Sequence, residues 1–264
     1  MRLKGAVVVV TGASSGIGWA SAWAFARKGA SVVVCARREE RLRQLAGQIE
    51  QRGGTATAIT CDVAEPDAVA ALRERVQEVH GRCDVLVNNA GVPGGGAFAD
   101  LTVQQVQRVV GVNYLGVLFC TKAFLPMMLA EGSGHVVNVA SLAGRFAVPG
   151  SSVYSSTKHA VVAFSESLFY EVSPRGVLVT TVNPGFVRTE GFPHRERRLL
   201  PVMRPERVAR TIVEVVERGA GPEVSLPRWV ASFQLVRLMA PPLYRWGFRR
   251  AVERGLGTTG AGGG

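Results

Sequence analysis

A regular alternation of two kinds of segment is the feature that most constrains the fold of this chain of 264 residues. One kind is a short, mostly apolar and β-branched run without a polar face, which predicts a strand buried on both sides. The other kind has helical periodicity, and turns with Gly, Pro or Asp separate the two. The predicted strands are Ala6–Thr11, Ser31–Ala36, Thr57–Cys61, Val85–Asn88, Gly134–Ala140 and Leu178–Val182. The predicted helices are Ile17–Lys28, Glu39–Arg52, Pro66–His80, Val103–Ala130 and Val153–Val172.

Strands that are buried on both faces and joined through helices form a parallel sheet with helices on both sides. We therefore predict an α/β fold, a single doubly wound parallel sheet over residues 1–226, in which ligands bind at the carboxyl ends of the strands. A helix at Arg207–Arg218 and a short strand at Glu223–Leu226 complete this domain. Residues 227–254 form an atypical apolar-basic C-terminal extension, and residues 255–264 are expected to be a disordered tail.

No segment of the sequence indicates export or membrane insertion. Residues 1–5 lead straight into the first predicted strand. The apolar run of this strand is far too short to be the apolar core of a signal peptide. No uninterrupted apolar stretch reaches the ~18 residues of a spanning helix. The cysteines lie in apolar segments without metal-ligand spacing, at Cys35, Cys61, Cys83 and Cys120. We therefore expect a cytoplasmic protein with buried, reduced thiols and no metal site.

The net charge of +11 is unevenly distributed. From Arg188 to the end of the chain, 14 arginines stand against 7 acidic residues. Such asymmetry favours nucleic acid or an anionic membrane surface as a partner. The arginines are not interleaved with aromatic residues in a nucleic-acid-binding motif, so we expect no nucleic acid. An arginine-rich composition without a dedicated partner is the simpler interpretation.

A glycine-rich loop separates the first predicted strand from the first predicted helix. Its sequence is Thr-Gly-Ala-Ser-Ser-Gly-Ile-Gly, residues 11–18. Glycines at a strand-to-helix turn let the backbone bend tightly and approach a pyrophosphate, and the free N–H groups of the helix N-terminus favour an anion there. The predicted cofactor-binding residues of this loop are Gly12, Ser14, Ser15, Gly16, Ile17 and Gly18.

The Thr-Gly-x3-Gly-x-Gly spacing, followed by Asn88-Asn89-Ala90-Gly91 after the fourth strand, resembles the short-chain dehydrogenase/reductase family. The resemblance covers about residues 5–190 and implies a Rossmann-like oxidoreductase. It also implies that Asn89, Ala90 and Gly91 line the cofactor. Asn88 is expected to connect the central strands instead.

The end of the second predicted strand favours NADP over NAD as the cofactor. NAD-binding relatives carry an acidic residue where this chain has Ala36, and Arg37 follows it. A guanidinium binds a 2′-phosphate, and Ser14 can add a hydroxyl contact. The alternative is that Arg37 and Arg38 form a solvated helix start paired with Glu39 and Glu40. By resemblance Asp62 and Val63 contact the adenine, unless Asp62 only initiates the following helix.

Tyr154 and Lys158 lie four residues apart and therefore share one face of a predicted helix. Reduction of a carbonyl requires a proton donor at its oxygen, and an ordinary phenol, with a pKa near ~10, is a weak acid. A neighbouring cation favours tyrosinate, so Lys158 is expected to lower the pKa of Tyr154 toward neutrality. Ser141 follows a predicted strand at its carboxyl end and can donate a hydrogen bond to the substrate oxygen.

The family resemblance completes this set with Asn113. It implies that Tyr154 is the acid/base, that Lys158 also binds the nicotinamide ribose, and that Asn113 holds a water relay to Lys158. It further implies that the segment after the sixth strand binds the nicotinamide carboxamide. The residues of that segment are Pro184, Gly185, Val187 and Thr189.

The chain departs from the family after about Glu190. Residues 190–203 correspond to the substrate loop, and its apolar residues predict an apolar substrate end: Phe192, Leu199, Leu200 and Met203. The usual C-terminal segment that closes a tetramer is lacking. We therefore expect a homodimer or higher homo-oligomer, formed through the helices at Val103–Ala130 and Val153–Val172. Residues 229–252 have three interpretations: a cap over the substrate pocket or a subunit interface, a peripheral membrane contact, or a poorly ordered segment.

The sequence therefore predicts an NADP(H)-dependent oxidoreductase that interconverts a carbonyl and an alcohol, on an apolar ketone, aldehyde or 3-oxoacyl compound. Two alternatives stay open. One is a membrane-surface reductase of lipid or isoprenoid carbonyls. The other is a regulatory protein that binds the cofactor without turnover.

Overall fold

The computed structural model describes residues 1–191 and 202–251. Most of the predicted substrate loop, with Phe192, Leu199 and Leu200, lies outside the described residues, and so does the predicted disordered tail.

Seven strands form one sheet in which all neighbouring pairs are parallel, in the order β3-β2-β1-β4-β5-β6-β7. The strands are β1 (Val7–Thr11), β2 (Ser31–Ala36), β3 (Thr55–Thr60), β4 (Val85–Asn88), β5 (Gly134–Val139), β6 (Val177–Pro184) and β7 (Glu223–Leu226). The helices are α1 (Gly16–Ala26), α2 (Glu39–Glu50), α3 (Pro66–His80), α4 (Val103–Val110), α5 (Gly116–Ala130), α6 (Ser152–Val172), α7 (Pro205–Arg218), α8 (Ser232–Met239) and α9 (Pro241–Ala251). The predicted doubly wound parallel sheet is confirmed.

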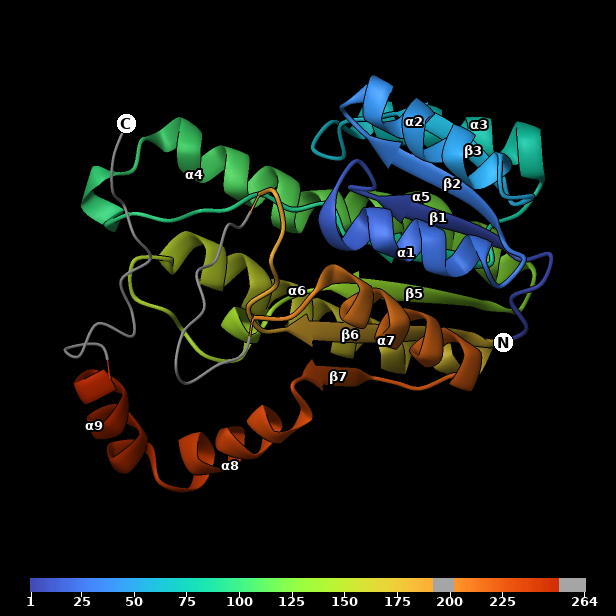
Figure 1. Cartoon of the computed structure of the whole chain (residues 1–264). Coiled ribbons are helices and arrows are strands. Elements are labelled where there is room, and N and C mark those ends of the chain that lie inside the picture. Colours follow the sequence, from blue (N-terminus) through green and yellow to red (C-terminus); the bar gives the residue numbers. More distant parts are fainter. Residues whose placement is uncertain (192–201, 252–264) are drawn as a thin grey trace.

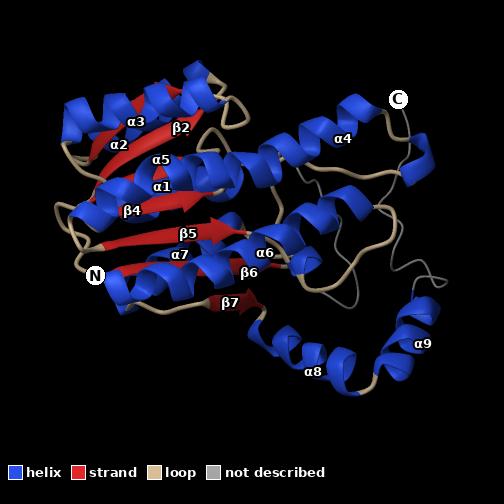
Figure 2. Ribbon diagram, turned by 180° about the vertical axis from the view of Figure 1, so that it is seen from behind, coloured by secondary structure: helices blue, strands red, loops and turns tan. Residues whose placement is uncertain are grey.

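Alternate side chains of each strand enter two separate cores. Val8 and Val10 of β1 pack in the core beneath α1, α2 and α7, whereas Val7 and Val9 pack in the core beneath α3, α5 and α6. The two sides of the sheet are seen in turn in Figures 1 and 2. Both faces are covered because neither side of these apolar strands offers polar groups to water.

Most limits of the strands lie within one residue of the prediction, but β3 and β6 extend further. β3 begins at Thr55 rather than Thr57, because Thr55 pairs with Ser31 at the start of β2. β6 continues past Val182 to Pro184, because its last residues pair with β7. In both cases a partner that is remote in the sequence sets the limit of the strand.

The predicted helix Val103–Ala130 is divided by a π-helical turn at Gly111–Leu115, with α4 before it and α5 after it. Among the described residues, this segment alone is long and apolar enough to cross a membrane by length and composition, and 44% of its most apolar window is buried. α5 packs against α3, β4 and β5, which is the environment of a core helix. Packing against the sheet therefore accounts for the apolar character of the segment.

The C-terminal extension forms two helices, α8 and α9, below the edge strand β7 (Figure 1). α9 begins at Pro241, so the Pro-Pro pair that interrupts the predicted pattern separates the two helices. We call α8 and α9 together, residues 232–251, the apolar-basic hairpin. Their helical structure differs from the interpretation of the extension as poorly ordered.

Candidate active site

The order of the strands changes direction beside β1, because β2 and β3 lie on one side of it and β4 to β7 on the other. In open parallel sheets, ligands bind at the carboxyl ends of the strands at such a switch point. The predicted cofactor loop follows β1, and the Asn-Asn-Ala-Gly segment follows β4. The fold therefore brings these two motifs to the same edge of the sheet.

Three glycines of the loop occupy positions that leave no room for a side chain. Gly12 has φ +66°, and a Cβ there would lie 2.7 Å from the Cα of Ala90. Gly16 has φ +58°, and its Cβ would lie 2.8 Å from Cγ2 of Thr189. A Cβ on Gly18 would overlap the carbonyl oxygen of Gly12. The three glycines thus let the loop turn tightly against its neighbours, which is the backbone conformation of a pyrophosphate-binding cradle.

The hydroxyl group of Thr11 fastens the cradle to β4. It accepts hydrogen bonds from the backbone N–H groups of Asn89 (3.0 Å) and Ala90 (3.1 Å). The side-chain amide of Asn89 returns a bond to the carbonyl oxygen of Thr11 at 2.9 Å. Asn88 donates instead to Asn138 of β5 at 2.8 Å, so its predicted role between the central strands agrees with its contacts.

The N-terminus of α1 fits an anionic ligand. Its N-cap residue is Ser15, and the Ser15 side chain forms no capping hydrogen bond. The N–H groups of a helix's first turn lack partners within the helix, and the helix dipole adds positive potential there. The cradle and this helix end therefore fit a dinucleotide pyrophosphate, and Ile17 is partly buried beside them.

Two arginines lie where a 2′-phosphate would be bound. Arg37 lies 3.5 Å from the carboxylate of Asp62. Arg38 donates two hydrogen bonds to Oγ of Ser14, at 3.1 and 3.2 Å. It donates two more to the carboxylate oxygens of Glu190, both at 3.1 Å. Both side chains are about half exposed, as in the alternative of a solvated helix start, but their ion pairs are with Asp62 and Glu190 and not with Glu39 or Glu40.

Arg38 and Glu190 are not among the cofactor-binding residues predicted from the sequence. Only the position of Arg38 directly after Arg37 could have indicated it, since both the serine and the glutamate are remote in the sequence. Asp62 also accepts a hydrogen bond from the N–H of Ala64 at 3.0 Å, so it shapes the turn before α3 as well. Val63 is buried beside Gly116 of α5.

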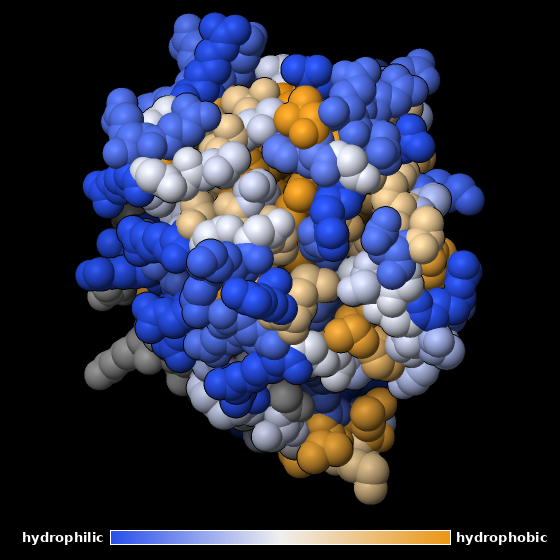
Figure 3. Space-filling view, turned by 90° about the vertical axis from the view of Figure 1, so that its right-hand side faces the viewer, coloured by the Kyte–Doolittle hydropathy of each residue, from blue (hydrophilic) through white to orange (hydrophobic). Residues whose placement is uncertain are grey.

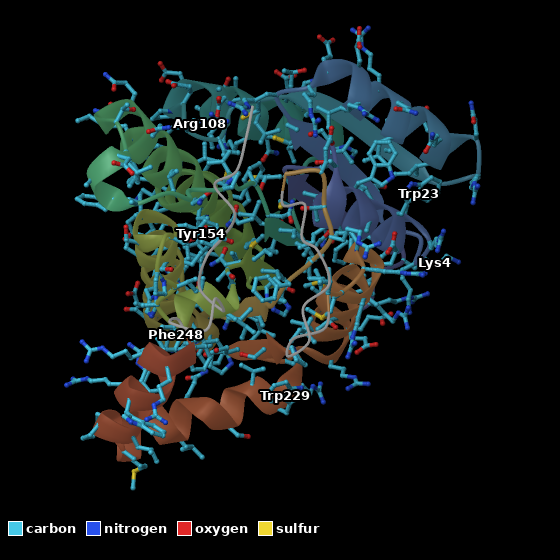
Figure 4. All side chains as sticks on the ribbon, turned by 60° about the vertical axis from the view of Figure 1, so that its left-hand side comes forward. Lys4, Trp23, Arg108, Tyr154, Trp229 and Phe248 are labelled. Carbon is cyan, nitrogen blue, oxygen red and sulfur yellow. The ribbon has the colours of Figure 1, made fainter. Side chains whose placement is uncertain are left out.

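The structure brings Ser141, Tyr154 and Lys158 together at the carboxyl end of β5. Nζ of Lys158 lies 5.7 Å from the ring centroid of Tyr154 and donates a hydrogen bond to the carbonyl oxygen of Val139 at 3.0 Å. Ser141, two residues after the end of β5, forms a hydrogen bond with the phenol of Tyr154. In Figure 4, Tyr154 lies on α6 between Arg108 above and Phe248 below.

Burial dominates the electrostatics of this pair. It raises the pKa of Tyr154 to about 12, and the hydrogen bond from Ser141 offsets this only in part. Burial also lowers the pKa of Lys158, which is 4% exposed, to about 8. The expected lowering of the Tyr154 pKa by Lys158 does not appear, because the shift of this pKa comes from burial and from the hydrogen bond with Ser141. The ammonium group of Lys158 is bonded instead to the carbonyl oxygen of Val139.

Asn113 is fully buried on the π-helical turn between α4 and α5. Its side-chain amide pairs with both backbone groups of Val92, accepting at 2.8 Å and donating at 2.9 Å. A Cβ on Gly91 would lie 3.4 Å from Oδ1 of Asn113 and 3.8 Å from Nζ of Lys158. The turn therefore places Asn113 beside the same narrow space as Lys158, and π-bulges of this kind occur often at functional sites.

The segment after β6 closes the other side of the site. The carbonyl oxygen of Pro184 accepts a hydrogen bond from Oγ of Ser141 at 3.5 Å, and the N–H of Gly185 donates to Leu226 of β7 at 2.8 Å. Val187 forms a single parallel bridge with Met203. These contacts hold the segment so that Thr189 lies against the glycine loop.

A dinucleotide cradle beside a Ser-Tyr-Lys set at the carboxyl ends of a parallel sheet defines an oxidoreductase that uses a nicotinamide cofactor. The comparisons with known proteins agree. The family model of short chain dehydrogenases matches residues 6–198. The chain belongs to the short-chain dehydrogenase/reductase family.

The chain is similar to a ketoacyl reductase of Nostoc, with 35% identity over 219 residues that cover 81% of this chain and 76% of the relative. It is 38% identical over 191 residues to the dehydrogenase/reductase SDR family member 7B of Mus musculus, covering 71% of this chain but only 59% of that longer protein.

Solved structures of family members contain either cofactor. A Burkholderia phymatum enzyme in complex with NAD matches with a TM-score of 0.83 and 26% identity, over 92% of this chain and 96% of the other. A variant of actinorhodin polyketide ketoreductase with NADPH matches with a TM-score of 0.77 and 34% identity, over 84% of this chain and 95% of the other. A nicotinamide cofactor is therefore common to the neighbours, and their structures do not decide between its two forms.

The buried ammonium group of Lys158 makes a prediction about stability. Burial lowers its pKa from the ordinary 10.5 to about 8, so the folded protein binds this proton more weakly than the unfolded chain does. Between these two pH values the wild type gains stability as the pH rises, and below about 8 the buried charge is a cost. Lys158→Met should therefore increase the free energy of unfolding at pH 7 by about 1–2 kcal/mol and remove that gain at alkaline pH.

Urea denaturation of both proteins between pH 6 and pH 10.5 measures this effect. Lys122→Met, which removes an exposed lysine of α5, is the control and should follow the wild-type pH profile. A Lys158→Met protein that is less stable than the wild type at pH 7 would contradict the assignment.

Proposed function

We propose that the protein is an NADPH-dependent carbonyl reductase. The observation that carries the proposal is the position of Ser141, Tyr154 and Lys158 at the same edge of the sheet as a glycine loop of the kind that binds dinucleotides. Thr189, which is expected to bind the nicotinamide carboxamide, lies against Gly16 of the loop. A dinucleotide bound at this loop would therefore have its nicotinamide end near Tyr154.

In carbonyl reduction, Ser141 donates a hydrogen bond to the substrate oxygen and Tyr154 transfers its phenolic proton to that oxygen. The bound reduced nicotinamide supplies the hydride. With a pKa of about 12 the phenol is protonated at neutral pH, as a proton donor has to be. The ammonium of Lys158 then stabilises the tyrosinate, and Asn113 holds the water relay that returns a proton to Lys158.

NADP preference is supported by the charges at the end of β2. No carboxylate stands at Ala36 to repel a phosphate, and Arg37 and Arg38 both present guanidinium groups at this end of the cradle. Glu190 competes with a phosphate for Arg38, because its carboxylate already accepts two contacts from that guanidinium. The 2′-phosphate therefore has to displace this carboxylate when NADPH binds.

The substrate proposed is an apolar ketone, an aldehyde or a 3-oxoacyl compound. Two similar proteins, a ketoacyl reductase and a polyketide ketoreductase, support a 3-oxo compound. The protein is proposed to act as a homodimer through α5 and α6, since Tyr170 of α6 and Leu115 at the start of α5 are exposed apolar side chains.

Tyr154→Phe tests the proposed proton transfer. The variant should lose 100-fold or more of kcat for carbonyl reduction, the usual order for a lost general acid, while its Kd for NADPH stays within about threefold. Tyr170→Phe is the matched control, because Tyr170 lies on the same helix with its ring exposed. Phenylalanine keeps the apolar ring that the proposed dimer face uses, so this variant should retain full activity. Steady-state reduction of a panel of ketones and 3-oxoacyl thioesters gives kcat. A kcat of Tyr154→Phe within a few-fold of the wild-type value would overturn the mechanism. If the wild type bound NADPH but reduced none of these compounds, the result would favour a regulatory protein.

Substitutions at the two arginines and at Glu190 test the cofactor preference. Arg37→Ala and Arg38→Ala should each weaken NADPH binding about tenfold or more, since each removes charge-assisted hydrogen bonds to a phosphate. Glu190→Gln should strengthen it several-fold, because the competing charge is gone. NADH binding should change little in all three variants. Fluorescence titration measures both Kd values, with Arg43→Ala on the exposed side of α2 as the control. An unchanged ratio of NADPH to NADH affinity in the arginine variants would refute NADP preference.

A further inference from the structure

The apolar-basic hairpin and the turn before it expose an unusual number of large apolar side chains. The described residues have 11 exposed large apolar side chains, and six of them lie between residues 229 and 246. Each of the six is more than half exposed: Trp229, Leu235, Leu238, Met239, Leu243 and Trp246. Figure 3 shows hydrophobic atoms gathered at the bottom of the molecule, at the height where α8 lies in Figure 1. Exposed apolar side chains that are gathered in one segment indicate an interaction surface rather than scattered exposure.

The charge of the same segment is of one sign. Between Glu223 and Glu253 the chain has five arginines and no acidic residue. The guanidinium of Arg250 lies 4.3 Å from the ring of Trp246, which places a cation directly beside an exposed indole. Four of these arginines are exposed, namely Arg228, Arg245, Arg249 and Arg250, whereas Arg237 contacts the body of the protein. The surface therefore combines apolar side chains with positive charge and has no carboxylate that would bind a cationic partner.

The opposite side of the hairpin is attached to the body of the protein. The ring of Tyr244 lies 6.4 Å from that of Phe146 and 5.6 Å from that of Phe248. Arg237 donates a hydrogen bond to the carbonyl oxygen of Arg145, and Arg145 pairs with Glu223 of β7. These contacts fix which face of the hairpin points inward, so the apolar and basic face is held outward.

We propose that this outer face docks on an anionic lipid surface. Tryptophan rings are favoured at the boundary between headgroups and acyl chains, apolar side chains such as Leu238 and Met239 enter the acyl region, and arginines bind lipid phosphates. A second copy of the chain is the weaker occupant. A two-fold interface through this face would set arginine against arginine, and the whole chain carries a net charge of +11.

Docking would also place the candidate active site near the lipid. The hairpin is attached to Arg145 and Phe146, which follow Ser141 by four and five residues, at the carboxyl edge of the sheet. An apolar carbonyl compound dissolved in the membrane would therefore reach the site from the side of the hairpin. Delivery of substrate rests on the proposed function, whereas docking itself does not.

Sedimentation of the full-length protein with lipid vesicles tests the docking. Vesicles of phosphatidylcholine with about one-third phosphatidylglycerol should pellet the protein, and vesicles of phosphatidylcholine alone should pellet several-fold less. Binding should weaken as the salt concentration rises. Equal binding to both vesicles, or none to either, overturns the proposal whatever the enzyme's activity.

Two double variants separate the apolar and the charged contributions. Leu238→Ser with Met239→Ser removes two of the most exposed apolar side chains, and Arg245→Gln with Arg249→Gln removes two exposed charges. The arginine pair should lower the partition coefficient about fivefold per charge, and the apolar pair at least as much. Arg41→Gln with Arg43→Gln on α2 is the matched charge control and should bind as the wild type does.

NADPH titration and thermal unfolding of each variant check that cofactor binding and the fold are intact. Wild-type cofactor binding with lost sedimentation supports docking through the hairpin. Unchanged sedimentation of both double variants overturns it. A second result would also overturn the proposal: the wild type fails to bind vesicles, and the apolar variant is a monomer where the wild type is a dimer. A second copy of the chain would then cover this face.

Discussion

The close approach of the turn after β1 to the turn after β4 is the constraint on which the site depends. Gly12 and Gly18 allow it because neither has a side chain, and the hydroxyl of Thr11 secures it through the N–H groups of Asn89 and Ala90. A methyl group at either glycine would push the two strand ends apart. The N-terminus of α1 depends on this geometry because the helix follows the glycine loop directly. The turn after β4 also reaches Lys158, since a Cβ on Gly91 would lie 3.8 Å from its Nζ.

Burial then divides the roles of the two ionisable groups on α6. The same desolvation raises the pKa of Tyr154 and lowers that of Lys158, so it favours the neutral form of each. At neutral pH the phenol stays protonated, and the amine, with a pKa of about 8, stays charged. The proton donor is therefore protonated and lies beside a positive charge, although burial makes the phenol a weaker acid than it is in water. The stability lost by burying an ammonium group is the cost of this arrangement.

The sheet and most of the site could be predicted from the sequence because they depend on local patterns. Uniformly apolar strands dictate two covered faces, and glycines at a strand-to-helix turn dictate a cradle. The features that could not be predicted depend on contacts remote in the sequence. The π-helical turn that holds Asn113 follows from its bonds to Val92, and the network of Arg38 follows from the position of Glu190. The pKa of Tyr154 follows from burial, which spacing along a helix does not reveal.

Transfer of deuterium from labelled cofactor tests the central claim most directly. The wild-type protein is incubated with an apolar 3-oxoacyl ester and with NADPH that carries deuterium at the transferable position of the nicotinamide ring, and the product is analysed by mass spectrometry. The position of the Ser-Tyr-Lys set beside the glycine cradle predicts an alcohol with one deuterium on the former carbonyl carbon, formed in equal amount to oxidised cofactor. Binding of NADPH with no labelled alcohol from any ketone, aldehyde or 3-oxoacyl compound tested would contradict the claim.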